Sequence, residues 1–270
     1  MAALMEAAFF DLDKTIIARS SALALGRSFF REGLIGRSDL LKGMYAQLVF
    51  HLMGADEQKM ERMREDAARL TSGWEQDKVR QVVNEVLDEV ISPLIYAEAL
   101  ELIVDHHEAG RLVCIVSSSP EEIVEPLARM VGADDWIATR AEVSEGRFTG
   151  QLEFYAYGPH KAAAIGSLAA ERGIDLDGSY AYTDSATDLP MLELVGHPVA
   201  VNPDRDLRKL ADSRNWQIET FKNPVSLRDR LPSIEIPQVT AQNAAIAAAG
   251  VAAVAAGAWW ITRKSGGKSE

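Results

Sequence analysis

Two aspartates stand one residue apart in the stretch DLDKT. Asp11 and Asp13 follow the apolar run 7–10 (AAFF), whose length and composition suit a buried strand. Paired carboxylates serve in acid–base catalysis and bind hard cations, but Asp-x-Asp also occurs in calcium loops and ordinary turns. The pair alone therefore does not define the function, and other residues of the chain are needed to do so.

Other polar side chains also follow apolar runs that we predict to be strands. They are Ser117, Ser118 and Ser119 after 112–116 (LVCIV), and Asp184 and Asp188 after 180–182 (YAY). Lys161 instead opens a helical segment. Ligands of parallel sheets bind beyond the carboxyl ends of the strands, so we expect these groups to converge on one edge.

Several carboxylates cannot share a small site as bare anions, since like charges push one another towards protonation. A divalent cation resolves this conflict. Mg²⁺ takes a few carboxylates and keeps water or substrate phosphate in its remaining positions. With a lysine and a serine hydroxyl as partners for phosphate oxygens, the set predicts a phosphoryl-transfer site with a Mg²⁺ cofactor, where catalysis rests on positioning and charge stabilisation.

The elements that must position these groups alternate between strand and helix. Predicted strands are 7–10, 112–116, 180–182, 198–201 and 216–221, and helical patterns cover 120–133 and 160–174. Turn signals within 141–157 indicate a short hairpin. The alternation predicts an α/β fold with a Rossmann-like, mostly parallel sheet as its core.

Residues 18–92 do not fit that alternation, because they contain helical patterns and no convincing strand. We predict a helical cap subdomain over 18–92, inserted into a core of 1–17 and 93–221. Residues 222–243 have the proline and polar content of a linker.

The C-terminal stretch 244–261 carries no charge and ends in two tryptophans, followed by Arg263 and Lys264. This pattern predicts a transmembrane or membrane-anchor helix, of open orientation, although an alanine-rich segment could also pack on a partner or stay disordered. The N-terminus lacks the features of a signal peptide. We therefore expect a membrane-associated protein whose catalytic domain is cytoplasmic.

Composition excludes other classes of function. The net charge is -12 and Lys and Arg form no long run, which argues against binding of nucleic acid. The single cysteine, Cys114, lies in an apolar run, so the chain can form no internal disulfide and no thiolate cluster. The oligomeric state stays open.

Taken in order, the motifs resemble those of the haloacid dehalogenase superfamily of phosphohydrolases. The matching stretches are DLDKT, Ser117 of IVSSS, Lys161 of GPHKA, and TDSATD with Asp184 and Asp188. The resemblance covers roughly residues 6–205. The helical insert straight after the first motif resembles the cap of the phosphoserine phosphatase-like branch, subfamily IB.

The resemblance implies roles for these residues. Asp11 would be the nucleophile that forms an aspartyl phosphate, and Asp13 would be the general acid and then the base. The implied metal ligands are Asp11, the Asp13 backbone carbonyl, Asp184 and Asp188. The implied catalytic lysine is Lys161, and the implied phosphate and substrate contacts are Thr15, Ser117, Ser118, Lys161 and Arg19.

The first motif can also be aligned with a motif of another family. DKT also begins the phosphorylation motif of P-type ATPases, which would make Asp13 the nucleophile. That motif continues with Gly-Thr, whereas Ile16 and Ile17 follow here and Asp11 would have no role. The comparison favours Asp11.

The substrate is less well defined. Phosphoserine phosphatases carry an acidic residue shortly after the first motif to meet the substrate ammonium, but no Asp or Glu follows Asp13 here until Glu32. Arg19 could instead face an anionic or neutral leaving group. Bulky apolar residues of the cap either pack its helices or line a groove for an acyl chain; they are Phe29, Phe30, Tyr45, Leu48, Phe50 and Met53.

We therefore expect a Mg²⁺-dependent phosphomonoester hydrolase, with a lysophospholipid or another lipid-linked phosphate as the favoured substrate. A small soluble ester is the runner-up. Phosphotransfer to an alcohol would use the same residues, and a non-catalytic, membrane-tethered binding module with the same fold is the alternative from another class.

Overall fold

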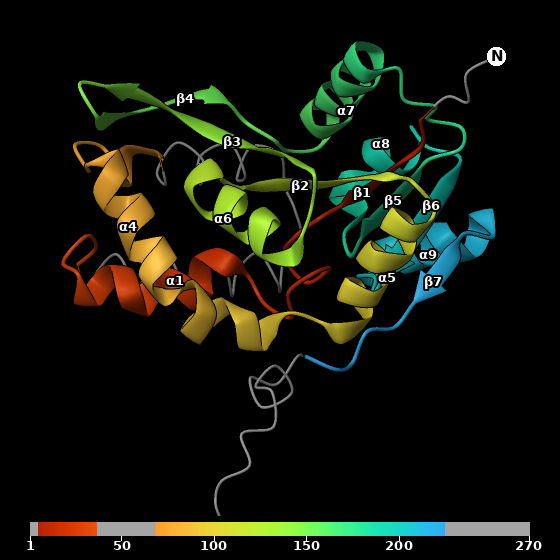
Figure 1. Ribbon diagram of the computed structural model, residues 1–270, viewed down its shortest axis with the longest axis horizontal. Helices are drawn as coiled ribbons and strands as arrows, with labels where there is room; N and C mark the ends of the chain where they lie inside the picture. Colours follow the sequence, from red (N-terminus) through yellow and green to blue (C-terminus); the bar gives the residue numbers. More distant parts are fainter. Residues whose placement is uncertain (1–4, 37–67, 225–270) are drawn as a thin grey trace, which may run out of the picture. The chain divides into compact units, whose positions relative to one another are not determined.

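The computed structural model describes residues 5–36 and 68–224. Within these ranges, strands form one seven-stranded sheet in the order β4-β3-β2-β1-β5-β6-β7, with helices around it (Figure 1). On one side of β1 lie β2, β3 and β4, in that order, and on the other side lie β5, β6 and β7. The predicted α/β class with a mostly parallel sheet is confirmed.

The central strands pair in parallel. β1 (Ala7–Phe10) lies between β2 (Leu112–Pro120) and β5 (Tyr180–Thr183), and β6 (His197–Val201) and β7 (Gln217–Glu219) follow beyond β5. All four residues of β1 are buried, as expected for a strand covered by helices on both faces of a parallel sheet. The predicted strands are confirmed, and their carboxyl ends meet at one edge.

One helix layer covers the side of the sheet to which Ala8 and Phe10 point. Both side chains belong to a hydrophobic cluster that includes residues of α5 (Ala97–Glu108) and α6 (Glu121–Val131). α6 ends where Gly132 adopts a left-handed φ of 83°, a conformation that glycine adopts without strain. The glycine after this helical pattern therefore fixes its end.

The other helix layer packs on the opposite face, towards Ala7 and Phe9. These residues share a second cluster with α7 (Pro159–Arg172), α8 (Leu189–Leu192) and α9 (Arg205–Arg214). Successive side chains of a strand point to opposite faces, so β1 contributes side chains to both layers. The architecture has three layers, helix–sheet–helix, and the ends of β1, β2 and β5 open at the same edge.

The predicted hairpin forms from β3 (Asp135–Ser144) and β4 (Arg147–Phe154). Its turn residues Glu145 and Gly146 have φ values of 50° and 75°, which suit a two-residue hairpin turn. The strand begins earlier than the turn signals indicate, because the first part of β3 pairs in parallel with β2. The hairpin thus continues the main sheet at its edge.

The described part of the predicted cap is helical. It contains α1 (Ser21–Arg31), α4 (Gln76–Val86) and a π-helical turn η1 (Leu87–Ile91), and a short 3₁₀ turn η2 (Ser92–Leu94) begins at its last residue. Side chains of α1, α4 and η1 join the same cluster as Phe10. The helical patterns predicted within 37–67 lie outside the described residues, and the division into core and cap stays a prediction.

The predicted membrane-associated localisation is corrected by the structure. No helix within residues 5–36 and 68–224 is long and apolar enough to cross a membrane. A span needs about 20 apolar residues, whereas the longest helix in these ranges, α7, has 14 and includes Lys161 and Arg172. The predicted linker beyond Pro224 and the predicted C-terminal helix 244–261 lie outside the described residues.

Candidate active site

Asp11 is the first residue after β1, at the carboxyl edge of the sheet. Its backbone N–H donates to the carbonyl of Tyr182 on β5, at 2.9 Å, which extends the pairing of the two strands by one residue. The side chain is buried. Apolar packing of β1 on both faces therefore fixes the place where this carboxylate leaves the sheet.

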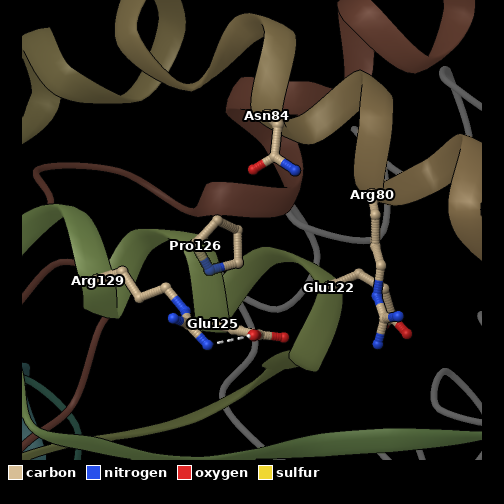
Figure 2. Close-up of a pocket in the computed structure, with 6 residues that line it drawn as sticks. All are labelled: Arg80, Asn84, Glu122, Glu125, Pro126 and Arg129. Carbon is tan, nitrogen blue, oxygen red and sulfur yellow. Dashed lines mark hydrogen bonds and ion pairs between the residues drawn. The ribbon is translucent and has the colours of Figure 1, made fainter.

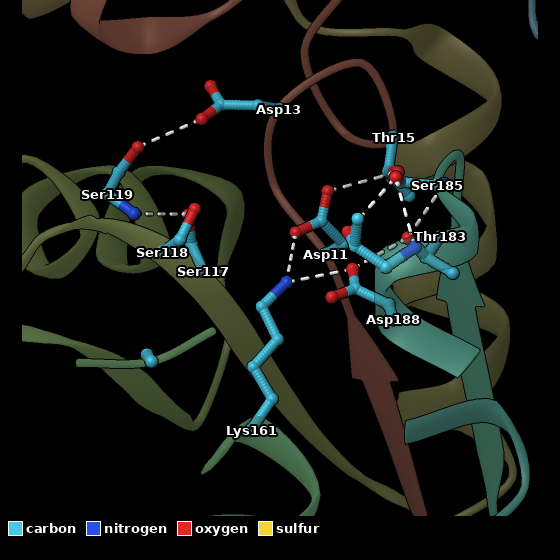
Figure 3. A network of polar contacts seen from close by, with 12 residues as sticks. Asp11, Asp13, Thr15, Ser117, Ser118, Ser119, Lys161, Thr183, Ser185 and Asp188 are labelled. Atoms are coloured by element: carbon cyan, nitrogen blue, oxygen red, sulfur yellow. Dashed lines mark hydrogen bonds and ion pairs between the residues drawn. The ribbon is translucent and has the colours of Figure 1, made fainter. Parts of the chain in front are cut away.

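Lys161 joins Asp11 to Asp188. The Lys161 ammonium lies 2.7 Å from Asp11 Oδ1 and 2.9 Å from Asp188 Oδ2 (Figure 3). All three side chains are buried. Thr183, the last residue of β5, donates its hydroxyl to Asp188 Oδ2 at 2.8 Å. Three segments far apart in the sequence thus meet in one ion-pair cluster, as the positions of these residues predict.

The electrostatics of this cluster are dominated by burial. Burial raises the pKa of Asp11 to about 8, opposed by the charge of Lys161 and reinforced by the like charges of Asp188 and Asp184. Burial alone would lower the pKa of Lys161, but the charges of Asp11 and Asp188 outweigh it and raise that pKa. The single positive charge of Lys161 therefore cannot neutralise both Asp11 and Asp188 when the two carboxyl groups are ionised.

Asp184 follows β5 and is also buried. Burial raises its pKa to about 7; the charge of Lys14 opposes the rise, whereas Asp188 and Asp204 add to it. The Lys14 ammonium lies 3.8 Å from Asp184 Oδ2, and Lys14 has a left-handed φ of 64°. Sequence reasoning gave Lys14 no role, and no sequence signal marks its conformation.

Asp13 faces a different set of groups. Its Oδ1 accepts the backbone N–H of Ser21 at 2.6 Å, and its Oδ2 accepts the Ser119 hydroxyl at 2.9 Å. The hydroxyls of Ser21 and Ser119 lie 3.0 Å apart. Figure 3 shows Asp13 turned towards Ser119, while Asp11 faces Lys161. The two aspartates of the motif are thus held by separate partners.

The three serines after the apolar part of β2 are not equivalent. Ser117 and Ser119 are buried, whereas Ser118 is exposed, as the alternation of side chains along a strand requires. Ser117 Oγ accepts the backbone N–H of Ser119 at 3.1 Å. Sequence reasoning named Ser117 and Ser118 as phosphate contacts and gave Ser119 no role, although the period of two points to Ser117 and Ser119 as the pair on one face.

Two further predicted residues lie differently. Thr15 is buried and donates its hydroxyl to Asp11 Oδ2 at 3.4 Å, so it belongs to the cluster. Arg19 is exposed, and within the described ranges no hydrogen bond or ion pair joins it to the cluster. The structure therefore gives no contact that supports a substrate role for Arg19.

The buried carboxylates fit a divalent cation. In the described part of the chain, no three Asp, Glu, His or Cys side chains gather into a ready-made metal cage. Mg²⁺ does not require one, because it usually takes one or two carboxylates together with water and phosphate oxygens. Asp11 and Asp184 have raised pKa values, and Lys161 is already engaged by Asp11 and Asp188. Added positive charge would favour the ionised form of Asp11 and of Asp184.

A separate pocket of about 370 Å³ lies between α4 and α6 (Figure 2). Its lining residues are Arg80, Asn84, Glu122, Glu125, Pro126 and Arg129. Charges of both signs line it, and Arg129 and Glu125 are already paired at 2.9 Å. None of the residues of the ion-pair cluster lines this pocket.

The fold and the cluster define a class of α/β enzymes that handle phosphate groups at the carboxyl edge of a parallel sheet. A sequence model of the haloacid dehalogenase-like hydrolase family matches residues 8–193. The chain belongs to this family, and it is an enzyme of the phosphatase class. Phosphatases of the family generally use Mg²⁺.

Similar proteins agree with this assignment. A Mycobacterium tuberculosis protein named a probable phosphatase is 52% identical over 252 residues, 93% of this chain and 86% of that protein. A phosphoserine phosphatase of the same organism is 35% identical over 244 residues, 90% and 78% of the two chains. A solved structure of a protein with unknown function from Bordetella pertussis matches with a TM-score of 0.71 and 27% identity, over 80% and 98% of the two chains.

Proposed function

We propose that this phosphatase hydrolyses phosphomonoesters with bound Mg²⁺, through an aspartyl phosphate on Asp11. The observation that carries the proposal is the separation of the two motif aspartates. Asp11 is buried against Lys161, whereas Asp13 is held by Ser119 and the N–H of Ser21. The two carboxylates are thereby held by different partners, which suits two different roles in one reaction.

In the first step, a carboxylate oxygen of Asp11 attacks phosphorus and the bond between phosphorus and the ester oxygen breaks. Asp13, protonated at this stage, gives its proton to the leaving oxygen, which departs as an alcohol. Lys161 offsets negative charge on Asp11 and on the phosphoryl oxygens, and the Ser117 hydroxyl can donate to one of them. The product is an acyl phosphate on Asp11.

In the second step, water attacks phosphorus while Asp13, now a carboxylate, takes a proton from that water. The bond between Asp11 and phosphorus breaks, which restores the Asp11 carboxylate and yields inorganic phosphate. Asp13 ends the cycle protonated, so both atoms and protons balance. Asp188, which accepts from Lys161 and Thr183, orients the lysine.

Asp11, Asp184 and the backbone carbonyl of Asp13 are the groups that would hold Mg²⁺, with Asp188 in support through Lys161. When bound, the cation supplies positive charge that offsets the phosphate oxygens and favours ionised Asp11. The support for this metal set is the burial and crowding of the carboxylates of Asp11, Asp184 and Asp188, which raise the pKa of Asp11 and of Asp184 despite Lys161 and Lys14.

We infer that the substrate is a small soluble phosphomonoester. Phe29 packs against Trp74, with ring centroids 6.2 Å apart, and joins the edge of the hydrophobic core, which favours packing over an acyl groove. Phe30 is 36% exposed and so is only partly packed. The other four cap residues, from Tyr45 to Met53, lie outside the described ranges. No Asp or Glu lies between Asp13 and Glu32, so the chain lacks the acidic residue that would meet the ammonium group of phosphoserine. One relative is nevertheless named a phosphoserine phosphatase.

The test is phosphate release from a panel of esters, measured with Mg²⁺ and with a chelator. The panel contains phosphoserine, histidinol phosphate, small sugar and alcohol phosphates, and lysophosphatidate. Mg²⁺-dependent release that favours a small ester supports the proposal. Preference for lysophosphatidate would contradict the substrate class, and no release from any ester would contradict the catalytic function.

A further inference from the structure

Asp13 is clamped between two elements that lie far apart in the chain. Ser119, which follows the apolar part of β2, donates its hydroxyl to Oδ2, and Ser21, the first residue of α1, donates its backbone N–H to Oδ1. Ser119 is 106 positions from Asp13 and 98 from Ser21. One side of the clamp therefore belongs to the sheet and the other to the helical segment that follows the first motif.

The clamp is built from buried groups. Ser21 and Ser119 are 0% and 7% exposed, and their hydroxyls lie 3.0 Å apart. A hydroxyl in such a place needs partners, because an unpaired buried polar group is costly. The backbone N–H of Ser119 donates to Ser117 Oγ, a contact within the last residues of β2 that helps to hold Ser119 where its side chain meets Asp13.

The two donors fix the orientation of the Asp13 carboxyl group without covering it. A carboxylate has about four lone-pair positions, and the two donors occupy only one on each oxygen. The remaining positions stay open to a substrate or a water, while the two fixed donors stop the carboxyl group from rotating. An acid that must meet a leaving oxygen and then a water needs this restraint.

We propose that Ser119 is a positioning residue for the general acid–base step, acting through Asp13 together with the N–H of Ser21. This inference rests on the proposed function of Asp13. Proton transfer to the leaving group matters most for a poor leaving group such as an alkoxide, and least for p-nitrophenolate, which departs without help. Loss of the Ser119 hydroxyl therefore slows the formation of the aspartyl phosphate selectively for alkyl esters.

The experiment compares kcat/KM for an alkyl phosphate and for p-nitrophenyl phosphate in Ser119→Ala, Ser119→Thr, Asp13→Ala and the double variant Asp13→Ala/Ser119→Ala; kcat/KM reports the steps up to departure of the leaving group and leaves out the later hydrolysis of the aspartyl phosphate, in which Asp13 serves both esters alike. In Ser119→Ala we expect kcat/KM for the alkyl ester to fall about 10- to 100-fold and kcat/KM for the aryl ester by no more than about threefold. Ser119→Thr keeps a hydroxyl and should restore part of the loss. The double variant should be no slower than Asp13→Ala, because both changes remove one function.

The control is Ser167→Ala, which removes an exposed hydroxyl of α7 that only donates to a helix carbonyl. An equal loss for both esters in Ser119→Ala, or additive losses in the double variant, would overturn the positioning role while Asp13→Ala keeps its leaving-group selectivity. If Asp13→Ala itself shows no such selectivity, the proposed role of Asp13 fails, and this inference fails with it.

Discussion

The Lys161 ammonium lies 2.7 Å from Asp11 Oδ1, although 150 residues separate the two positions in the sequence. β1 carries Asp11 to the edge of the sheet, and the start of α7 brings Lys161 to the same place. Both groups are buried, so the pair is formed without water to weaken it. Activity and stability should both depend on this contact.

Asp11→Asn should lose at least about 1,000-fold in kcat, because an amide cannot attack phosphorus as a carboxylate does. The variant should remain folded, since Asn keeps an oxygen that can accept from Lys161. Steady-state phosphate release and thermal unfolding measure both points. Asp212→Asn, which changes an exposed aspartate of α9, is the matched control and should keep parental activity. Turnover of Asp11→Asn at the parental rate would refute the nucleophile assignment.

Lys161→Met should destabilise the protein by about 3–5 kcal/mol at pH 8, because it leaves Asp11 and Asp188 buried without their shared cation. At pH 5.5 the loss should be smaller, since buried carboxyls without that cation can protonate. Urea unfolding at the two pH values tests this. The control Lys209→Met breaks an exposed pair with Asp206, and we expect an effect below about 1 kcal/mol. Equal losses at both pH values would contradict the account.

Chelator-treated protein should become less stable as pH rises from about 4 to about 8. Asp11 and Asp184 have folded-state pKa values of about 8 and about 7, above the ordinary value of 3.8. In this range the folded state holds protons that the unfolded chain has lost, so the free energy of unfolding falls as pH rises. Mg²⁺ should therefore raise the melting temperature more at pH 8 than at pH 5. A chelated protein whose stability rises over this range would show that the pKa values of the two carboxyls are not raised.

Thr183→Val should cost about 1–3 kcal/mol, because it removes a buried hydroxyl that donates to Asp188 and accepts the Ser185 N–H. Valine keeps the shape of threonine, so packing is largely retained. Thr149→Val is the control: the Thr149 hydroxyl also donates to a carboxylate, Glu142, and accepts an N–H, that of Gln151, but both contacts are exposed to water, so we expect a change within about 0.5 kcal/mol. Chemical denaturation compares the two, and similar small effects would mean that Asp188 does not depend on Thr183.

Much of the fold could be predicted from the sequence, because the central strands are short apolar runs that end in polar residues. Asp11, Asp184 and Asp188 could be placed at one edge for the same reason, and Lys161 by its position at a helix start. β3 was only partly predicted: the stretch from Asp135 to Arg140 mixes charged and apolar residues, and its pairing with β2 is a non-local contact.

The contacts around Asp13 were not predicted. The hydrogen bond from Ser119 depends on how far β2 continues beyond its apolar part, and that from Ser21 depends on where α1 begins. Lys14 reaches Asp184 because its backbone is left-handed, which residue type does not reveal. These features arise from long-range packing, whereas periodicity reports on local structure.

The central claim is that Asp11 carries the phosphoryl group, and chemical trapping tests it most directly. The enzyme is mixed with a phosphomonoester that it turns over and with Mg²⁺, quenched during turnover, treated with borohydride, which reduces an acyl phosphate to an alcohol, and mapped by mass spectrometry. We predict that position 11 is converted to homoserine while position 13 stays aspartate. Homoserine at position 13, or at neither position, would contradict the account.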